Sequence, residues 1–268
     1  MSSNDKLRYP VLLVHGMGFR DFKGINYWGR IPKELEINGA RIYYGNHQSA
    51  ASVADSAKEL AERIKKIVDS TGCKKLNIIA HSKGGLDCRY AIKHLGMGEY
   101  IASLTTVNTP HRGCEFADYL ITELPRDIVS LIERVYNKLS KRLGDPSPDF
   151  MAAVKDLTAS VCVERDKAIE VPSGIFCQSV GSVMKRADDG RFPMNFSYVL
   201  VKHFNGDNDG LVSEDSFRWG EKYTLLNVES ENGISHCDII DLSRKDIDGF
   251  NVRDFYISLV SDLRERGF

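Results

Sequence analysis

The sequence LNIIAHSKGG, at residues 76–85, joins a short apolar run to a serine and a pair of glycines. The apolar run predicts a buried strand, and the residues after Ser82 predict the start of a helix. A serine at the tip of such a tight turn needs small residues two positions on either side, which here are Ala80 and Gly84. Gly85 allows the helix to begin close to the strand. The stretch predicts a nucleophile elbow, although by itself it also fits an ordinary strand-to-helix loop.

The overall composition is that of an ordinary globular protein, with 42% apolar and 27% charged residues in a chain of 268. A net charge of -1 gives no electrostatic reason to expect nucleic acid or an anionic membrane as a partner. The six cysteines are scattered without a C-x-x-C pair, so we expect reduced thiols and no zinc site.

The sequence contains neither a membrane span nor a recognisable signal peptide. No run approaches the ~18 apolar residues that a transmembrane helix needs. Residues 1–9 are polar and lack the apolar core of a signal peptide, so the expected location is cytoplasmic. A protein whose signal had been removed would look the same, and it would be secreted.

Apolar periodicity predicts alternating strands and helices over the first 113 residues, which indicates an α/β fold with a parallel sheet covered on both faces. Residues 114–171 break this alternation, and we interpret them as a helical lid or cap inserted within one domain that spans residues 1–268. Besides residues 76–81, strands are predicted at 9–14, 40–44, 103–107, 174–180, 197–201 and 223–228. Helices are predicted at 53–71, 83–95, 123–143, 149–159 and 252–264.

A serine nucleophile needs a base, and histidine is suited to this role because its pKa lies near neutral pH. A carboxylate then holds the imidazole, and on this kind of sheet the chain order is serine, acid, histidine. His236 lies in a loop after the last predicted strand and is the favoured base. His111 comes too early to leave room for an acid, and His203 lies in the run VKHF at residues 201–204, where a satisfied strand histidine is the favoured interpretation.

The acid is expected in the loop NGDNDGLV, at residues 205–212. Asp209 is the favoured candidate. Asp207 is the alternative, with a turn-forming role as its competing interpretation. Asp215 is less favoured because it lies further along a segment that is expected to be exposed.

Acyl transfer also requires an oxyanion hole, formed by the N–H of the residue after the nucleophile and an N–H from a loop after an early strand. These predict Lys83 and, within VHGMG at residues 14–18, Met17. The competing interpretation of that loop is a simple glycine-rich turn. It lacks the spacing and the lysine of a phosphate-binding loop.

Together, five segments resemble the bacterial lipase and esterase branch of the α/β-hydrolase family. The resemblance implies a serine carboxylic-ester hydrolase with Ser82, Asp209 and His236 as its triad, an acyl-enzyme intermediate and no required cofactor. Another acyl-transfer enzyme of this fold (a thioesterase, phospholipase or acyltransferase) and a non-catalytic ligand-binding relative remain alternatives. The matching segments are VHGMG at 14–18, AHSKGG at 80–85, NTPHRG at 108–113, NDGLV at 208–212 and SHCD at 235–238.

The resemblance also implies two features outside the triad. Some related lipases hold a structural calcium ion, for which Asp238 and either Asp188 or Asp189 would be the ligands here. Asp238 fits an N-cap before Ile239 better. The insertion at residues 114–171 stands where these lipases carry a lid, which would favour an acyl ester or lipid substrate and transient contact with a lipid interface. A permanently docked cap fits the sequence equally well.

Overall fold

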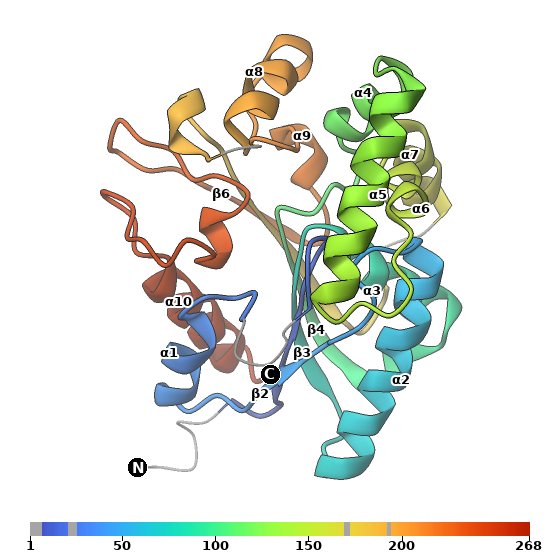
Figure 1. Cartoon of the computed structure of the whole chain (residues 1–268). Helices are drawn as coiled ribbons and strands as arrows, with labels where there is room; N and C mark the ends of the chain where they lie inside the picture. Colours follow the sequence, from blue (N-terminus) through green and yellow to red (C-terminus); the bar gives the residue numbers. More distant parts are fainter. Residues whose placement is uncertain (1–6, 21–25, 169–171, 192–193) are drawn as a thin grey trace.

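The computed structural model describes residues 7–20, 26–168, 172–191 and 194–268. A six-stranded sheet lies at the centre of this described part, in the order β2-β1-β3-β4-β5-β6, and every neighbouring pair is parallel (Figure 1). The predicted α/β architecture is therefore confirmed. The strands are β1 (Val11–Val14), β2 (Ile42–Tyr44), β3 (Leu76–His81), β4 (Ile101–Val107), β5 (Phe176–Ser182) and β6 (Lys222–Leu226).

Helices cover both faces of the sheet, as Figure 1 shows, with α1 and α10 on one side and α2 and α3 on the other. Side chains alternate along β1, so that Val11 and Leu13 pack toward α1 and α10 while Leu12 and Val14 pack toward α2 and α3. This explains why the strand is apolar throughout. These four helices are α1 (Ile31–Ile37), α2 (Val53–Thr71), α3 (Lys83–His94) and α10 (Val252–Glu265).

The predicted ends of α2 are confirmed by its capping contacts. The Ser52 hydroxyl accepts from the N–H of Asp55 at 3.1 Å and donates to the Asp55 carboxylate at 2.7 Å. Gly72 ends the helix in the left-handed conformation, with φ of 66°, and its N–H donates to the Val68 carbonyl.

The insertion between β4 and β5 is helical, as predicted, but it contains more helices than the sequence indicated. Predicted helices at residues 123–143 and 149–159 correspond to α5 and α6. The short helices α4 and α7 were not predicted, because few of their positions are buried and no period is visible. The four helices are α4 (Glu115–Thr122), α5 (Arg126–Arg142), α6 (Phe150–Asp156) and α7 (Ala159–Ala168).

The strand predicted at residues 197–201 is wrong, because this run lies inside helix α8 (Met194–Asn205). Its β-branched and aromatic residues favoured a strand by propensity. The buried positions Met194, Tyr198 and Val201 instead follow a helical spacing of four and three residues. His203, which was interpreted as a satisfied strand histidine, is an exposed residue of α8.

All six cysteines have free thiols, as predicted. None of the helices in the described ranges is both long and apolar enough to cross a membrane.

Candidate active site

The candidate residues gather at one end of the sheet, the end formed by the carboxyl termini of its parallel strands. Ser82 directly follows β3, and the loop at residues 15–18 follows β1, the neighbouring strand. Asp209 lies between α8 and the short helix α9 (Glu214–Phe217), and His236 lies after β6. The fold therefore brings segments that are far apart in the sequence together at the carboxyl end of the sheet.

The turn at Ser82 has the strained geometry of an elbow. Ser82 has φ of 55° and ψ of -133°, a conformation that non-glycine residues rarely adopt. Two glycines allow the loop after β1 to pack against this turn. A Cβ on Gly84 would lie 2.4 Å from the His15 carbonyl oxygen, and one on Gly16 would lie 2.7 Å from the Ser82 Cβ.

The structure brings the three predicted triad residues into hydrogen-bond contact. The Ser82 Oγ lies 3.0 Å from His236 Nε2, and His236 Nδ1 lies 2.5 Å from Asp209 Oδ2. The His236 N–H also donates to the Asp209 carbonyl at 2.8 Å. His236 and Asp209 are both buried, so the two side chains face each other away from bulk water.

Both carboxylate oxygens of Asp209 are held by further donors. Oδ1 accepts from the backbone N–H groups of Leu211 and Val212, each at 2.9 Å. Oδ2, which faces His236, also accepts from the side-chain amide of Asn108 at 2.7 Å. These bonds fix the plane of the carboxylate and orient it toward the imidazole.

The other candidates for the acid and base are not brought to Ser82. Asp207 is exposed, and Asp215 lies in the exposed part of α9. His111 is buried away from the triad, where Nε2 lies 3.0 Å from the Thr106 hydroxyl. His203 lies on α8.

Asn108 is a residue to which the sequence analysis assigned no role. It follows β4 directly, has φ of 46°, and bonds Ser182 Oγ at 2.8 Å as well as Asp209. An asparagine directly after a buried strand, at the edge that carries the elbow, is the signal that could have identified it.

His81, which packs against the candidate base His236, was also not identified from the sequence. The ring of His81 lies 4.5 Å from that of His236, and Tyr27 Oη lies 2.8 Å from His81 Nδ1. Burial lowers the pKa of His81 well below its usual value. A neutral His81 ring can therefore lie beside His236 without repelling a proton that His236 gains.

The two predicted oxyanion donors flank Ser82. Lys83 is the first residue of α3, so its N–H has no acceptor within the helix and lies at the positive end of the helix dipole. Met17 lines the same cavity as Ser82. Their roles as donors stay predictions.

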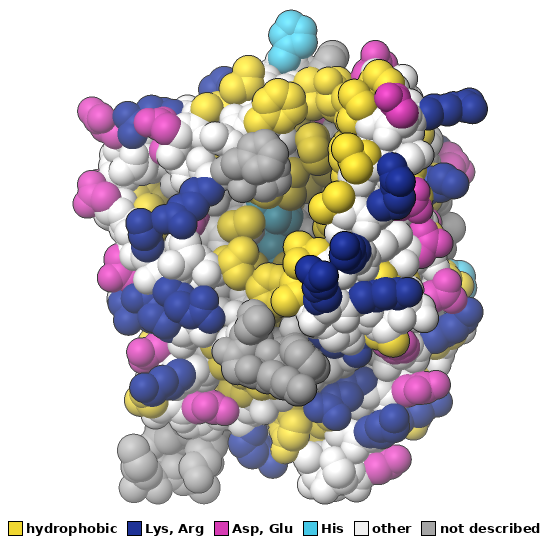
Figure 2. Space-filling model, in the orientation of Figure 1, with side chains coloured by type: hydrophobic (Ala, Val, Ile, Leu, Met, Phe, Trp, Pro, Cys, Tyr) yellow, Lys and Arg dark blue, Asp and Glu magenta, His cyan; other side chains and the backbone are white. Residues whose placement is uncertain are grey.

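An apolar cavity of about 360 Å³ opens beside Ser82 and His236. Three helices of the insertion contribute to its wall, with Leu120 from α4, Tyr136 from α5 and Val154 from α6. In Figure 2 a hollow on the viewed face is ringed by hydrophobic side chains. Such a cavity suits a hydrocarbon chain better than a polar ligand.

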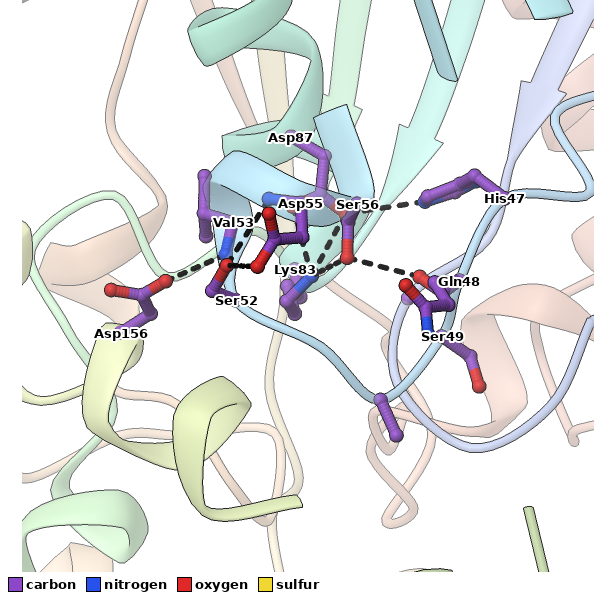
Figure 3. Close-up of polar contacts among 12 residues, drawn as sticks. His47, Gln48, Ser49, Ser52, Val53, Asp55, Ser56, Lys83, Asp87 and Asp156 are labelled. Carbon is purple, nitrogen blue, oxygen red and sulfur yellow. Dashed lines mark hydrogen bonds and ion pairs between the residues drawn. The ribbon is translucent and has the colours of Figure 1, made fainter. Parts of the chain in front are cut away.

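The insertion is anchored to the core near α6. Oδ2 of the buried Asp145 accepts from the N–H groups of Ser49 and Ala50, each at 3.0 Å. Asp156, at the end of α6, accepts from the N–H of Val53 at 2.6 Å, a contact visible in Figure 3. These carboxylates tie the insertion to the loop that precedes α2 and to the first residue of α2.

The apolar side chains that recur at helical spacing along α5 differ in their burial. Ile132 packs against the cluster that includes the cavity-lining residues. Ile128, Leu131, Val135 and Leu139 are exposed. Most of these side chains are therefore exposed on the surface rather than packed over the cavity.

The calcium candidates have protein partners. Asp189 Oδ2 accepts three backbone N–H groups, from Lys185, Arg186 and Gly233. The predicted N-cap role of Asp238 is wrong, because the short 3₁₀ helix η3 (Asp238–Ile240) begins at this residue and Cys237 is its N-cap.

Asp189 and Asp238 line one surface cleft, and Asp189 Oδ1 has no hydrogen-bond partner within the described ranges. Carboxylate oxygens are ligands that calcium prefers, but Arg186 Nε lies 3.8 Å from this oxygen. No group of three or more His, Cys, Asp or Glu side chains suited to a metal is found among the described residues. Calcium binding stays a prediction.

Comparison with known proteins gives three kinds of similarity. A triacylglycerol lipase of Pseudarthrobacter phenanthrenivorans is 33% identical over 165 residues, which are 57% of this chain and 51% of that protein. The match thus spans about half the length of that relative. Triacylglycerol lipase 2 of Saccharomyces cerevisiae is 29% identical over 271 residues, covering 91% of this chain and 75% of that protein. The mature Bacillus licheniformis lipase has the same fold, with a TM-score of 0.71, 20% identity, and coverage of 96% and 93% of the two chains.

The family model described as palmitoyl protein thioesterase matches residues 10–145, half of the chain. This segment begins at β1, contains Ser82 and extends past the end of α5. The two relatives are named triacylglycerol lipases, and the solved structure shares the fold of this chain. The chain therefore belongs to the palmitoyl protein thioesterase family and has the α/β-hydrolase fold.

Proposed function

We propose that this protein is a serine carboxylic-ester hydrolase that cleaves acyl esters through an acyl-enzyme on Ser82. The observation that carries the proposal is the line of contacts from the Ser82 hydroxyl through His236 to Asp209, at the wall of an apolar cavity. This arrangement supplies a nucleophile, a base and an orienting carboxylate in the order that acyl transfer needs.

The proposed reaction has two halves. Ser82 Oγ attacks the ester carbonyl while His236 Nε2 takes its proton, and His236 then gives that proton to the departing alcohol. Asp209 holds the imidazole and stabilises its charged form. The N–H groups of Met17 and Lys83 stabilise the oxyanion. Water, activated by His236, then hydrolyses the acyl-enzyme, and no cofactor takes part.

Thioester hydrolysis is a second candidate, which the match to the palmitoyl protein thioesterase family favours. An ester and a thioester of the same acid give the same acyl-enzyme, so the triad serves both. They differ only in the leaving group, an alcohol or a thiol. The apolar cavity would hold the same acyl chain in either case.

A fluorophosphonate probe and a substrate series test the proposal together. We expect a covalent adduct that maps to Ser82, and hydrolysis of p-nitrophenyl esters from butyrate to palmitate. Thioesters with the same acyl chains are assayed in parallel, and a consistently higher kcat/KM for them would favour the second candidate. An unlabelled Ser82 and no turnover of either series would instead indicate a ligand-binding protein.

We further propose that the face around the cavity contacts a lipid surface during turnover. Four apolar side chains of α5 are exposed, and Phe196 and Val199 on α8 are exposed as well. Figure 2 shows hydrophobic side chains gathered around the hollow on this face. Exposed apolar patches beside a binding cavity are typical of interaction surfaces. The α5 residues are Ile128, Leu131, Val135 and Leu139.

The double variant Val135→Asp/Leu139→Asp tests this surface. These side chains are 59% and 53% exposed, so burying both in a lipid interface contributes about 2 kcal/mol in total. We expect hydrolysis of a long-chain triglyceride emulsion to fall by at least about tenfold. Hydrolysis of a soluble butyrate ester should stay within about twofold, because the triad is untouched.

Ile37→Asp is the matched control, since Ile37 is 68% exposed on α1, which packs on the sheet face with α10 rather than with the insertion. It is expected to leave both activities unchanged. An equal loss on emulsion for Ile37→Asp, or no loss for the double variant, would argue against a lipid-contacting face at α5.

A further inference from the structure

The Lys83 side chain is buried beneath the elbow, although lysine is almost never fully buried without a partner. It is 1% exposed, and its ammonium group donates to Ser56 Oγ at 2.7 Å and to the two Asp87 carboxylate oxygens at 2.9 and 3.1 Å. Figure 3 shows these contacts. Ser56 belongs to α2, and Asp87 lies one turn further along α3. The side chain therefore ties the first turn of α3 to α2.

The same buried cluster reaches the loop that follows β1. His47 Nε2 lies 3.2 Å from Asp87 Oδ2, and the His47 ring stacks on His15 with centroids 4.3 Å apart. Burial lowers the pKa of His47 to about 3 and that of His15 well below its usual value, so both rings stack uncharged at neutral pH. Gly16 and Met17 come directly after His15. The cluster therefore contacts both segments that carry the proposed oxyanion donors.

Stability alone does not explain this ion pair. Burial raises the pKa of Asp87 to about 6, and the Lys83 ammonium opposes that rise, so the carboxylate is charged at neutral pH. The cost of removing two charges from water offsets most of their attraction, and well-packed apolar residues are often as stabilising. The place of Lys83, directly after Ser82, favours a geometric role.

The two donor segments also touch each other, so a shift in one changes the spacing of their N–H groups. A Cβ on Gly84 would lie 2.4 Å from the His15 carbonyl oxygen. Oxyanion donors act only when they lie at hydrogen-bond distance from the developing charge. A displacement of about 1 Å can lower a rate by about 10²-fold. An anchored side chain restrains the peptide group of its own residue.

We propose that the Lys83 side chain, held by Asp87 and Ser56, positions the Lys83 backbone N–H in the oxyanion hole. Asp87 extends the restraint through His47 and His15 to the loop that carries Met17. This inference rests on the proposed function, because an oxyanion forms only if Ser82 attacks an acyl carbonyl. The ammonium group does not touch the reacting atoms, so Lys83 Nζ, Asp87 and Ser56 are positioning groups.

The test replaces the ion pair with apolar side chains of similar shape, in Lys83→Met/Asp87→Leu. The single variant Lys83→Met leaves a carboxylate buried without its partner and is expected to be less stable than the double variant. We expect the double variant to keep a KM within about twofold and to lose kcat by about 10- to 100-fold, because the restraint acts on the transition state. A purely structural role predicts instead that restored stability restores kcat.

A transition-state analogue gives a second readout. A trifluoromethyl ketone forms an adduct with the serine that carries an oxyanion, so its Ki should rise by the factor by which kcat/KM falls. Lys93→Met is the matched control, since Lys93 is an exposed lysine of the same helix. We expect kcat, KM and Ki to be unchanged in that variant.

A folded double variant with wild-type kcat and Ki would overturn the proposal. Hydrolysis and Ser82 labelling by the wild-type enzyme would in that case still support the proposed function. If the double variant does not fold, Ser56→Ala decides, because it removes one anchor without leaving an unpaired charge. A lower kcat with a parallel rise in Ki supports the restraint, and unchanged values overturn it.

Discussion

Replacing Ser82 with alanine is expected to lower kcat for a soluble acyl ester by about 10⁵-fold or more. The hydroxyl that His236 would activate disappears, and with it the acyl-enzyme. The cavity also contains the thiols of Cys114 and Cys237, which could in principle react in its place. Burial raises the pKa of Cys237 to about 12 and that of Cys114 further, so neither forms a thiolate at neutral pH.

The measurement is steady-state hydrolysis of a p-nitrophenyl ester, with a thermal melt and fluorophosphonate labelling of the same preparations. Ser70→Ala, in the last turn of α2, is the control for removal of a serine hydroxyl away from the site. We expect Ser82→Ala to melt within a few degrees of wild type and to take no label, while Ser70→Ala behaves as wild type in both assays. More than about one hundredth of wild-type activity in folded Ser82→Ala would assign the nucleophile elsewhere.

The elbow and the sheet around it could be predicted because their constraints are local. A strained turn at Ser82 leaves space only for small residues nearby, and Gly84 shows this requirement directly in its contact with the His15 carbonyl. β3 is buried along its whole length, so it is recognisable as a short apolar run. In both cases the structural requirement, small residues at a tight turn or apolar residues in a buried strand, applies to residues that are neighbours in the sequence.

Helix α8 could not be predicted in the same way. Val199 and Val201 lie two residues apart, so in a strand they would share one face of the sheet. In the structure Val199 is exposed and Val201 is buried. The run also fits a helix whose inner face includes Tyr198 and Val201. Tertiary packing decides between the two, because it determines which side chains are covered. The five-residue window does not contain that information.

Some residues of the candidate site could likewise be predicted from the sequence, and others could not. Ser82, Asp209 and His236 could be proposed because the chemistry needs these residue types in a fixed order along the chain. Asn108 and the buried side chain of Lys83 were missed, because each acts through a contact with a distant segment. Such contacts impose no spacing on the sequence, and only the folded chain brings the partners together.

Asp209→Asn is expected to lower kcat by about 10⁴-fold, the second largest effect we anticipate. Oδ1 of Asp209 accepts from the N–H groups of Leu211 and Val212, so an asparagine keeps its carbonyl oxygen there. Its NH₂ group must then occupy the Oδ2 position, where it faces His236 Nδ1 and the donating amide of Asn108. His236 can accept a bond from that group only by moving its proton to Nε2. In that tautomer it cannot take the proton of the Ser82 hydroxyl.

Asp207→Asn is the matched control, because it makes the same chemical change two residues away. Asp207 is exposed, and its backbone carbonyl, which accepts from the Glu214 N–H, is unaffected by the substitution. We therefore expect kcat within about twofold of wild type, measured with the same soluble ester. A large loss in Asp207→Asn with little change in Asp209→Asn would reverse the assignment of the acid. Equal moderate losses would mean that the loop, rather than one carboxylate, holds His236 in place.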